Sequence, residues 1–162
     1  MGIGNNYFRK ILSECDIKGH SNVIDADITF KRIGALHDFA QDALDAQIWN
    51  DMRQYMPHDY GNLQEETQRL NMSVRGEVYA YTPQSDYGHY QYEGKLYVDP
   101  VYGKGAMYDP MYGFWSRPGI EKVKTDKDLV YTQPNAHRHW DEYAAEKHFS
   151  EWVKVVEAAL NK

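Results

Sequence analysis

Three histidines near the C-terminus are the side chains whose type and spacing come closest to a reactive site. His137, His139 and His148 stand in the stretch HRHWDEYAAEKH, and imidazole nitrogen is a common ligand of zinc. This H-x-H pair needs the chain to fold back before the third histidine can join it, and neither a cysteine pair nor an HExxH pattern accompanies it. On a helix, His148 shares one stripe with Ala144 and Trp152, which favours a core-facing role. We therefore predict no metal and no other cofactor.

Carboxylates in two places could imitate an acid–base pair. Asp141 and Glu142 follow His139, but the helix dipole favours acidic residues in the first turn of a helix. Asp25 and Asp27 alternate with apolar residues, which is typical of the solvated side of a strand. Neither pair is predicted to do chemistry.

Nucleophiles and phosphate-binding loops lack the context that would activate them. Ser85, Ser116 and Ser150 are not part of a GxSxG turn, and the glycines in 103–105 lack the strand and helix of a P-loop. Cys15 has no histidine signature beside it. We predict no catalytic residue, and hence that the chain is not an enzyme.

Composition narrows the classes of partner. The 162 residues fit one domain, and a single cysteine excludes an internal disulfide framework. The net charge is −6 with both signs interspersed, whereas binding to nucleic acid or to an anionic membrane requires a basic patch. No apolar run approaches the roughly 18 residues of a membrane-spanning helix. We expect no specific nucleic-acid binding and no membrane association.

Hydrophobic periodicity in the first half predicts a strand and two helices. Apolar and polar residues alternate over 22–30, which predicts a half-buried strand. Apolar residues then recur every three or four positions over 36–56, which predicts a long helix. Asn62 and Glu65 have the spacing of a capping box and predict a short helix over 62–68.

The second half predicts strands and a closing helix. Segments 70–75 and 78–82 alternate and are predicted to form a hairpin, whereas 86–94 fits either a strand or a helical turn. A strand is predicted at 128–132, and an apolar stripe predicts a long helix over 138–161.

These elements predict an α+β fold. We expect a mostly antiparallel sheet packed by one long central helix and one C-terminal helix, in a single domain over 23–162. Residues 1–22 are expected to form an N-terminal arm. Residues 95–133, which have no sustained period, are expected to form a long loop rich in tyrosine and glycine.

The expected loop is predicted to be an interface. Nine of the 14 tyrosines lie between Tyr79 and Tyr112. Ordering a loop of this length costs about 30–60 kcal/mol of backbone entropy, and burying its aromatic side chains returns about 20–40 kcal/mol. A partner surface would therefore stabilise it. The candidate interface residues are Tyr97, Tyr102, Tyr108, Tyr112, Phe114 and Trp115.

Three stretches resemble, in order, the minor capsid protein family of tailed double-stranded DNA phages, part of a wider neck and tail-completion group. They are MPHDYGNLQEETQ (56–68), YTPQSDYGHYQYEG (81–94) and HRHWDEYAAEKHFSEW (137–152). The last resembles the closing helix of the family, with a tryptophan, an acid, an alanine, a histidine and a second tryptophan at helical spacing. The matching positions are Pro57, Asp59, Gly61, Leu63, Thr82, Pro83, Tyr90, Gln91, Tyr92, Trp140, Glu142, Ala145, His148 and Trp152.

The resemblance implies a small α+β protein of the virion neck, without catalytic residues or cofactor. Such a protein is made in the host bacterial cytoplasm and assembles as a homo-oligomeric ring at the head–tail junction, close to the DNA channel. Its neighbours there would be portal, adaptor or stopper proteins, or the tail terminator and tail tube. Two alternatives stay open from the residues alone: a non-catalytic module that binds a glycan or small ligand with its aromatic loop, and a small hydrolase using the C-terminal histidines.

Overall fold

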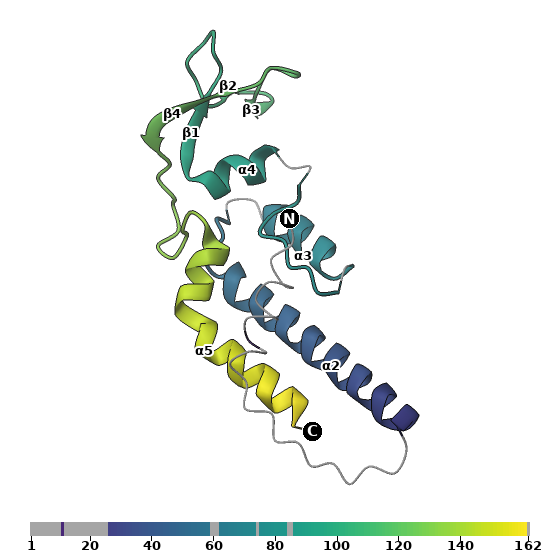
Figure 1. Ribbon diagram of the computed structural model, residues 1–162. Coiled ribbons are helices and arrows are strands. Elements are labelled where there is room, and N and C mark those ends of the chain that lie inside the picture. The colour runs from purple at the N-terminus through teal and green to yellow at the C-terminus, as the bar shows by residue number, and fades with distance from the viewer. Residues whose placement is uncertain (1–10, 12–25, 59–61, 74, 84–85, 162) are drawn as a thin grey trace.

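Two long helices lie side by side and hold the core. The computed structural model describes residues 11, 26–58, 62–73, 75–83 and 86–161. Helix α2 (Ala26–Arg53) and helix α5 (Trp140–Leu160) run in opposite directions along each other (Figure 1). The expected arm, residues 1–22, lies outside the described residues except for Ile11, which is fully buried.

The apolar stripes predicted for these helices meet in the core. On α2 the fully buried residues are spaced by four, which places them on one face of a helix. Two large indoles of α5 are also fully buried, and the side-chain N–H of Trp140 donates to the carbonyl of Ala80 at 2.8 Å. The buried residues of the pair are Ala40, Leu44, Ile48, Met52, Trp140, Ala144, Trp152, Val156 and Ala159.

The strand predicted at 22–30 is wrong for the residues that the structure describes. Residues 26–30 belong to α2, while 22–25 lie outside the described residues. A strand needs a partner strand to satisfy its backbone, and no strand is described near this segment. Extending a helix that has already begun adds one hydrogen bond per residue without a new nucleus.

The hairpin predicted over 70–82 is also wrong. Helix α3 (Asn62–Asn71) opens at the predicted capping box but continues beyond 68, and no strand is described in 72–83. The side chain of Asn71 takes the place of a partner strand. Its Nδ2 donates to the carbonyl of Tyr79 at 3.1 Å, and its Oδ1 accepts from the N–H of Tyr79 at 2.7 Å.

The remaining elements form the end of the molecule opposite the C-terminus (Figure 1). The undecided stretch 86–94 is helical, as α4 (Asp86–Glu93). Strand β1 (Lys95–Val98) pairs antiparallel with β4 (Val123–Asp128), and β2 (Met107–Asp109) pairs antiparallel with β3 (Gly113–Trp115).

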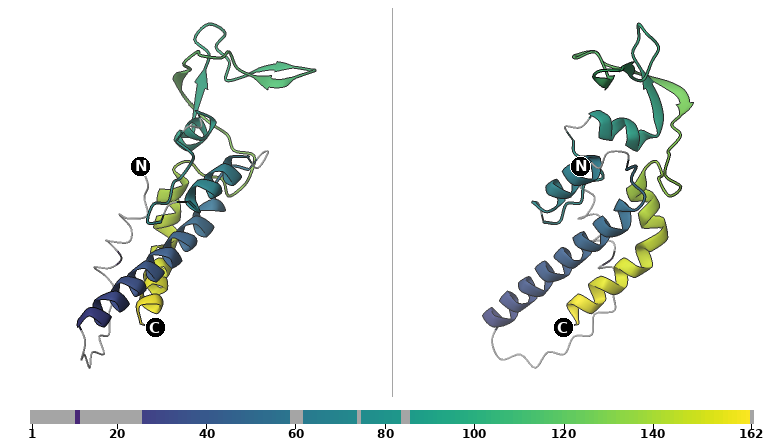
Figure 2. Two further views of the ribbon diagram at one scale, coloured as in Figure 1. Left: turned by 90° about the vertical axis from the view of Figure 1, so that its right-hand side faces the viewer. Right: turned by 180° about the vertical axis from the view of Figure 1, so that it is seen from behind.

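Residues 95–133 are therefore not the extended loop that was expected, since all four strands lie within them. The strand predicted at 128–132 is wrong beyond its first residue, because β4 ends at Asp128. The α+β class, the long helix and the C-terminal helix are confirmed. The two long helices pack chiefly on each other, and α4 and the small sheets extend beyond their end (Figure 2).

Candidate interaction surface

The β2–β3 hairpin projects from the sheet end of the molecule (Figure 2). Its turn is set by Asp109, whose Oδ1 accepts from the N–H of Met111 at 2.8 Å and of Tyr112 at 3.1 Å. The ring of Pro110 fixes the φ of that residue, and Gly113 takes a φ of 78°, which residues with an L side chain rarely adopt. The three-residue loop 110–112 thus joins the two strands, and the left-handed glycine follows it as the first residue of β3.

The same five-residue turn occurs ten residues earlier. DPVYG (99–103) and DPMYG (109–113) share aspartate, proline, tyrosine and glycine. The Oδ1 of Asp99 accepts from the N–H of Val101 at 2.8 Å and of Tyr102 at 3.0 Å, and Gly103 has a φ of 64°. Each turn thus presents an apolar residue and a tyrosine at its tip.

Asp99 differs from Asp109 because it is tied to the segment between β3 and β4. Its carboxylate is buried and accepts two hydrogen bonds from Arg117, at 2.6 and 2.7 Å. The Arg117 guanidinium holds the pKa of Asp99 well below its usual range, although burial opposes this. Arg117 also lies over the ring of Tyr102, 5.1 Å from its centroid. This ion pair fixes the base from which the hairpin projects.

Most of the predicted interface residues are exposed on this hairpin and its neighbouring turn. Tyr108 and Phe114 face each other across the strands, with ring centroids 5.2 Å apart. Met111, which was not among the predicted residues, adds an exposed apolar side chain at the tip. The exposed fractions are 57% for Tyr102, 66% for Tyr108, 80% for Met111, 80% for Tyr112, 71% for Phe114 and 45% for Trp115.

Tyr97 is different, since it lies in β1 and is half-buried. Its ring packs on Tyr90 of α4 with centroids 4.5 Å apart. Both rings line a groove of about 840 Å³ between α4, β1 and the root of the hairpin, and Phe114 and Trp115 line it from the hairpin. The Lys122 ammonium lies over the Tyr90 ring and donates to the carbonyl of Gly105. The groove is thus mostly apolar with two tethered cations, because Lys95 also lines it and pairs with Asp128 at 2.7 Å.

The residues that carry the family resemblance differ in how deeply they are buried. Pro57, Leu63, Trp140 and Trp152 are buried, whereas Pro83 and Glu142 are exposed. Tyr90, Gln91, Tyr92, Thr82, Ala145 and His148 are half-buried, and Asp59 and Gly61 lie outside the described residues.

The C-terminal histidines do not come together. His137 stacks on Tyr143 with ring centroids 4.1 Å apart, and His139 stacks on Tyr92 at 4.7 Å. His148 lies further along α5, half-buried against the end of α2. In the part of the chain that the structure describes, no cluster of three potential metal ligands contains His137 or His139.

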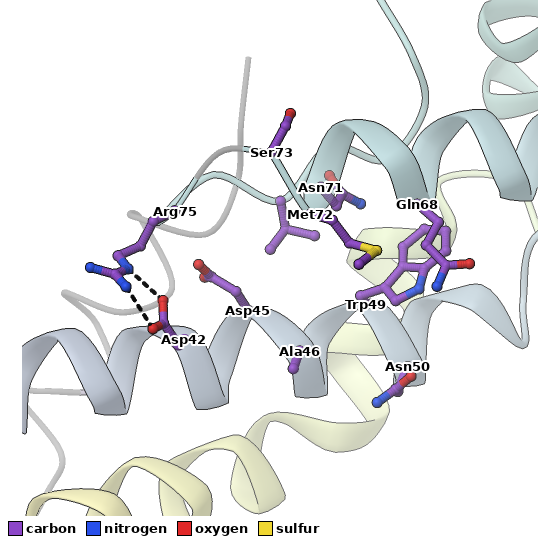
Figure 3. A pocket seen from close by; sticks show the side chains of 11 residues that line it. Asp42, Asp45, Ala46, Trp49, Asn50, Gln68, Asn71, Met72, Ser73 and Arg75 are labelled. Carbon is purple, nitrogen blue, oxygen red and sulfur yellow. Dashed lines mark hydrogen bonds and ion pairs between the residues drawn. The ribbon is translucent and has the colours of Figure 1, made fainter.

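A second concavity, of about 450 Å³, lies between α2, α3 and the turn that follows α3 (Figure 3). Arg75 is its cation, but the guanidinium is bonded to Asp42 at 2.5 and 2.8 Å and lies 3.3 Å from Asp38. Burial raises the pKa of Asp45, which accepts from the backbone N–H of Gly76. Because these charges already pair within the chain, this concavity has little to offer a charged ligand.

Within the described residues, no helix has both the length and the apolar character that a membrane-spanning segment needs. No protein-family model, curated protein or solved structure matches this chain.

Proposed function

We propose that the chain is a non-enzymatic assembly protein that self-associates through the β2–β3 hairpin. The observation that carries this proposal is the exposure of five large side chains on one short hairpin: Tyr108, Met111, Tyr112, Phe114 and Trp115. At about 200 Å² per side chain, their exposed fractions amount to roughly 700 Å². The largest apolar patch on a typical monomer is about 300–600 Å², whereas each partner of a standard interface buries about 800 Å².

A second copy of this chain is the partner that we propose. Residues 106–116 contain one charged side chain, Asp109, so covering the hairpin desolvates little charge. An isolated two-stranded hairpin is marginally stable in water, and both outer edges of β2–β3 are unpaired in the described structure. A projecting hairpin that meets a different face of the next copy gives a heterologous contact, and such contacts form a ring when the rotation between copies closes.

The biological setting that we propose is the neck of a phage virion, with the ring acting in head–tail joining or tail completion. The resemblance of three ordered stretches to the minor capsid protein family supports this setting. So does the burial of the two tryptophans that define the third stretch, Trp140 and Trp152, because motif residues shared for fold belong in the core. Adjoining neck or tail proteins would then cover the outer faces of the ring.

Mass photometry and light scattering over a concentration series test this proposal. Wild type is expected to form discrete oligomers, and the double variant Tyr108→Ser/Phe114→Ser is expected to stay monomeric. The matched control is Met72→Ser/Val130→Ser, which replaces side chains that are 80% and 92% exposed outside the hairpin and should assemble as wild type does. Interfaces of this size reach micromolar affinity or better, so a wild type that remains monomeric at about 100 µM contradicts the proposal.

The aromatic groove favours a second candidate function, the binding of a glycan or small apolar ligand. Tyr90, Tyr97 and Trp115 line a volume that suits a small ligand. This function predicts a monomer whose tryptophan fluorescence changes saturably with ligand. The single replacement Tyr108→Ser, which keeps Phe114 in the groove, should leave this fluorescence change as it is in wild type.

A further inference from the structure

Three side chains that could share a cation meet where α2 and α5 pack together. Asp51 lies in the last turn of α2, and His148 and Glu151 lie three residues apart on α5. One potential ligand atom of each lies within 4.8 Å of the others. Ligand atoms about 2.0–2.1 Å from a tetrahedral ion are about 3.4 Å apart, so small side-chain rotations would close the set. We propose that these residues bind a divalent first-row transition ion such as zinc.

The hydrogen bonds of His148 place one ring nitrogen opposite the Glu151 carboxylate. Its Nε2 lies 2.9 Å from the Tyr55 hydroxyl, and its Nδ1 lies 3.1 Å from Oε2 of Glu151. When Nε2 carries the proton and donates to Tyr55, Nδ1 directs a lone pair toward the carboxylate. In the other tautomer, Nδ1–H donates to Glu151 and Nε2 accepts from the Tyr55 hydroxyl; an ion at the site would take the place of that proton. Metal-binding histidines commonly have the other ring nitrogen bonded in this way, which fixes the tautomer.

Asp51 is held in a fixed orientation. Its side chain is buried, and Oδ2 accepts from the indole N–H of Trp152 at 2.7 Å and from Nε2 of Gln47 at 2.9 Å. Both bonds fall on Oδ2, and Oδ1 accepts neither of them. Among the described residues, no lysine or arginine forms an ion pair with Asp51 or Glu151, and two carboxylates balance the charge of a divalent ion.

An ion at this position would link the two helices that hold the core. Asp51 belongs to one helix, and His148 and Glu151 to the other, so the complete ligand set exists only in the folded chain. A ligand that binds the folded state alone stabilises it in proportion to the logarithm of its concentration. At about one hundred times the dissociation constant, the melting temperature should rise by about 5–10 °C.

Zinc titration of the full chain tests this proposal. The chain is first stripped of metal with a chelator, and it carries Cys15→Ser so that the thiol cannot compete for zinc. Isothermal calorimetry gives the stoichiometry and affinity, thermal unfolding gives the shift, and cobalt(II) absorption reports the geometry. The test variants are Glu151→Gln and His148→Gln. The control is His58→Gln, because His58 is an exposed histidine outside the cluster.

We expect one zinc per chain in wild type and binding within about threefold of wild type in the control. Both test variants should bind at least tenfold more weakly, since loss of even an outer-shell partner costs about 10–100-fold in metal affinity. Glu151 is exposed, so Glu151→Gln should keep the far-ultraviolet circular dichroism of wild type, and it decides the test if His148→Gln does not fold. Absence of binding to wild type, or less than a tenfold loss in Glu151→Gln, would overturn the proposal.

Discussion

Gly94 joins α4 to β1, and its replacement by alanine should test how the sheet end is attached to the helix pair. Its φ is 64°, and a Cβ built on it would lie 2.6 Å from the Cβ of Arg138 and 3.2 Å from the hydroxyl of Tyr131. The carbonyl of Gly94 accepts from the N–H of Leu129 at 2.9 Å, and Tyr131 donates to the carbonyl of Gln91 at 2.6 Å. The chain thus packs closely on itself at this junction.

Two costs add at Gly94. A left-handed backbone costs an L residue about 1–2 kcal/mol, and forcing a methyl group into a packed site costs about 1–3 kcal/mol. Because the nearest atom is a Cβ and not the end of a flexible side chain, Arg138 can move away only with its backbone. The sum, about 2–5 kcal/mol, lowers the melting temperature of a chain of this size by about 4–20 °C.

Gly103 provides a matched control, because it also has a φ of 64° but no atom lies within 4 Å of a Cβ built there. Gly103→Ala should therefore lose at most the backbone cost of about 1–2 kcal/mol, which corresponds to about 2–8 °C. Thermal unfolding followed by circular dichroism measures both variants. If Gly94→Ala melts no lower than Gly103→Ala, the close packing of Gly94 on Arg138 is refuted.

Two further predictions concern buried carboxylates. Asp99→Asn should destabilise the chain at neutral pH, because the ion pair with Arg117 is lost. The pKa of Asp99 is lowered in the folded state, so the stability advantage of wild type should shrink as pH falls below the ordinary aspartate pKa of about 3.9. Urea unfolding at pH 7 and pH 3 measures this difference, and a difference that stays constant would contradict the prediction. Trp152→Phe removes the N–H bonded to Asp51 and should cost about 1.5–3 kcal/mol, or about 3–12 °C in melting temperature, whereas Trp115→Phe on the exposed hairpin should change stability by at most about 0.5 kcal/mol. Equal effects of the two tryptophan variants in thermal unfolding would mean that the indole bond contributes nothing.

The helices could be predicted because their signal extends over many residues. Four fully buried residues of α2 recur at intervals of four, and the α5 stripe spans five turns, so a chance match is improbable. The capping box of Asn62 and Glu65 likewise marks the start of α3.

The strands could not be predicted as well, because short alternating segments depend on what they pair with. Tyr79 lies in a segment with the alternating pattern of a strand, but its backbone N–H and carbonyl are hydrogen-bonded to the side chain of Asn71. The β2–β3 hairpin did carry a local signal that the apparent lack of period concealed. Asp109, Pro110 and Gly113 specify the turn, because the aspartate accepts from backbone N–H groups, the proline fixes its own φ and the glycine adopts a positive φ. The same spacing from Asp99 repeats the turn.

The candidate functional residues, like the fold, could be predicted from the sequence only in part. Of the residues predicted to form an interface, Tyr108 and Tyr112 are exposed, whereas Tyr97 packs on Tyr90, which aromatic residue type alone does not indicate. Asp51 and His148 lie 97 positions apart, and only the antiparallel pairing of two helices brings them together. From sequence spacing, His148 could be compared only with the other two C-terminal histidines, and that comparison led to the prediction of no metal.

The separation of core and hairpin makes the two proposals independent. The core lies chiefly between α2 and α5, whereas the hairpin projects from the opposite end and contributes no fully buried side chain (Figure 2). Hairpin variants should therefore abolish self-association without lowering the melting temperature of the monomer. Variants of Glu151 should abolish the zinc-dependent rise in melting temperature without changing the oligomeric state. A hairpin variant that unfolds the monomer would show that the exposed aromatic residues support this chain's own fold, and that the contact with a second copy is not their role.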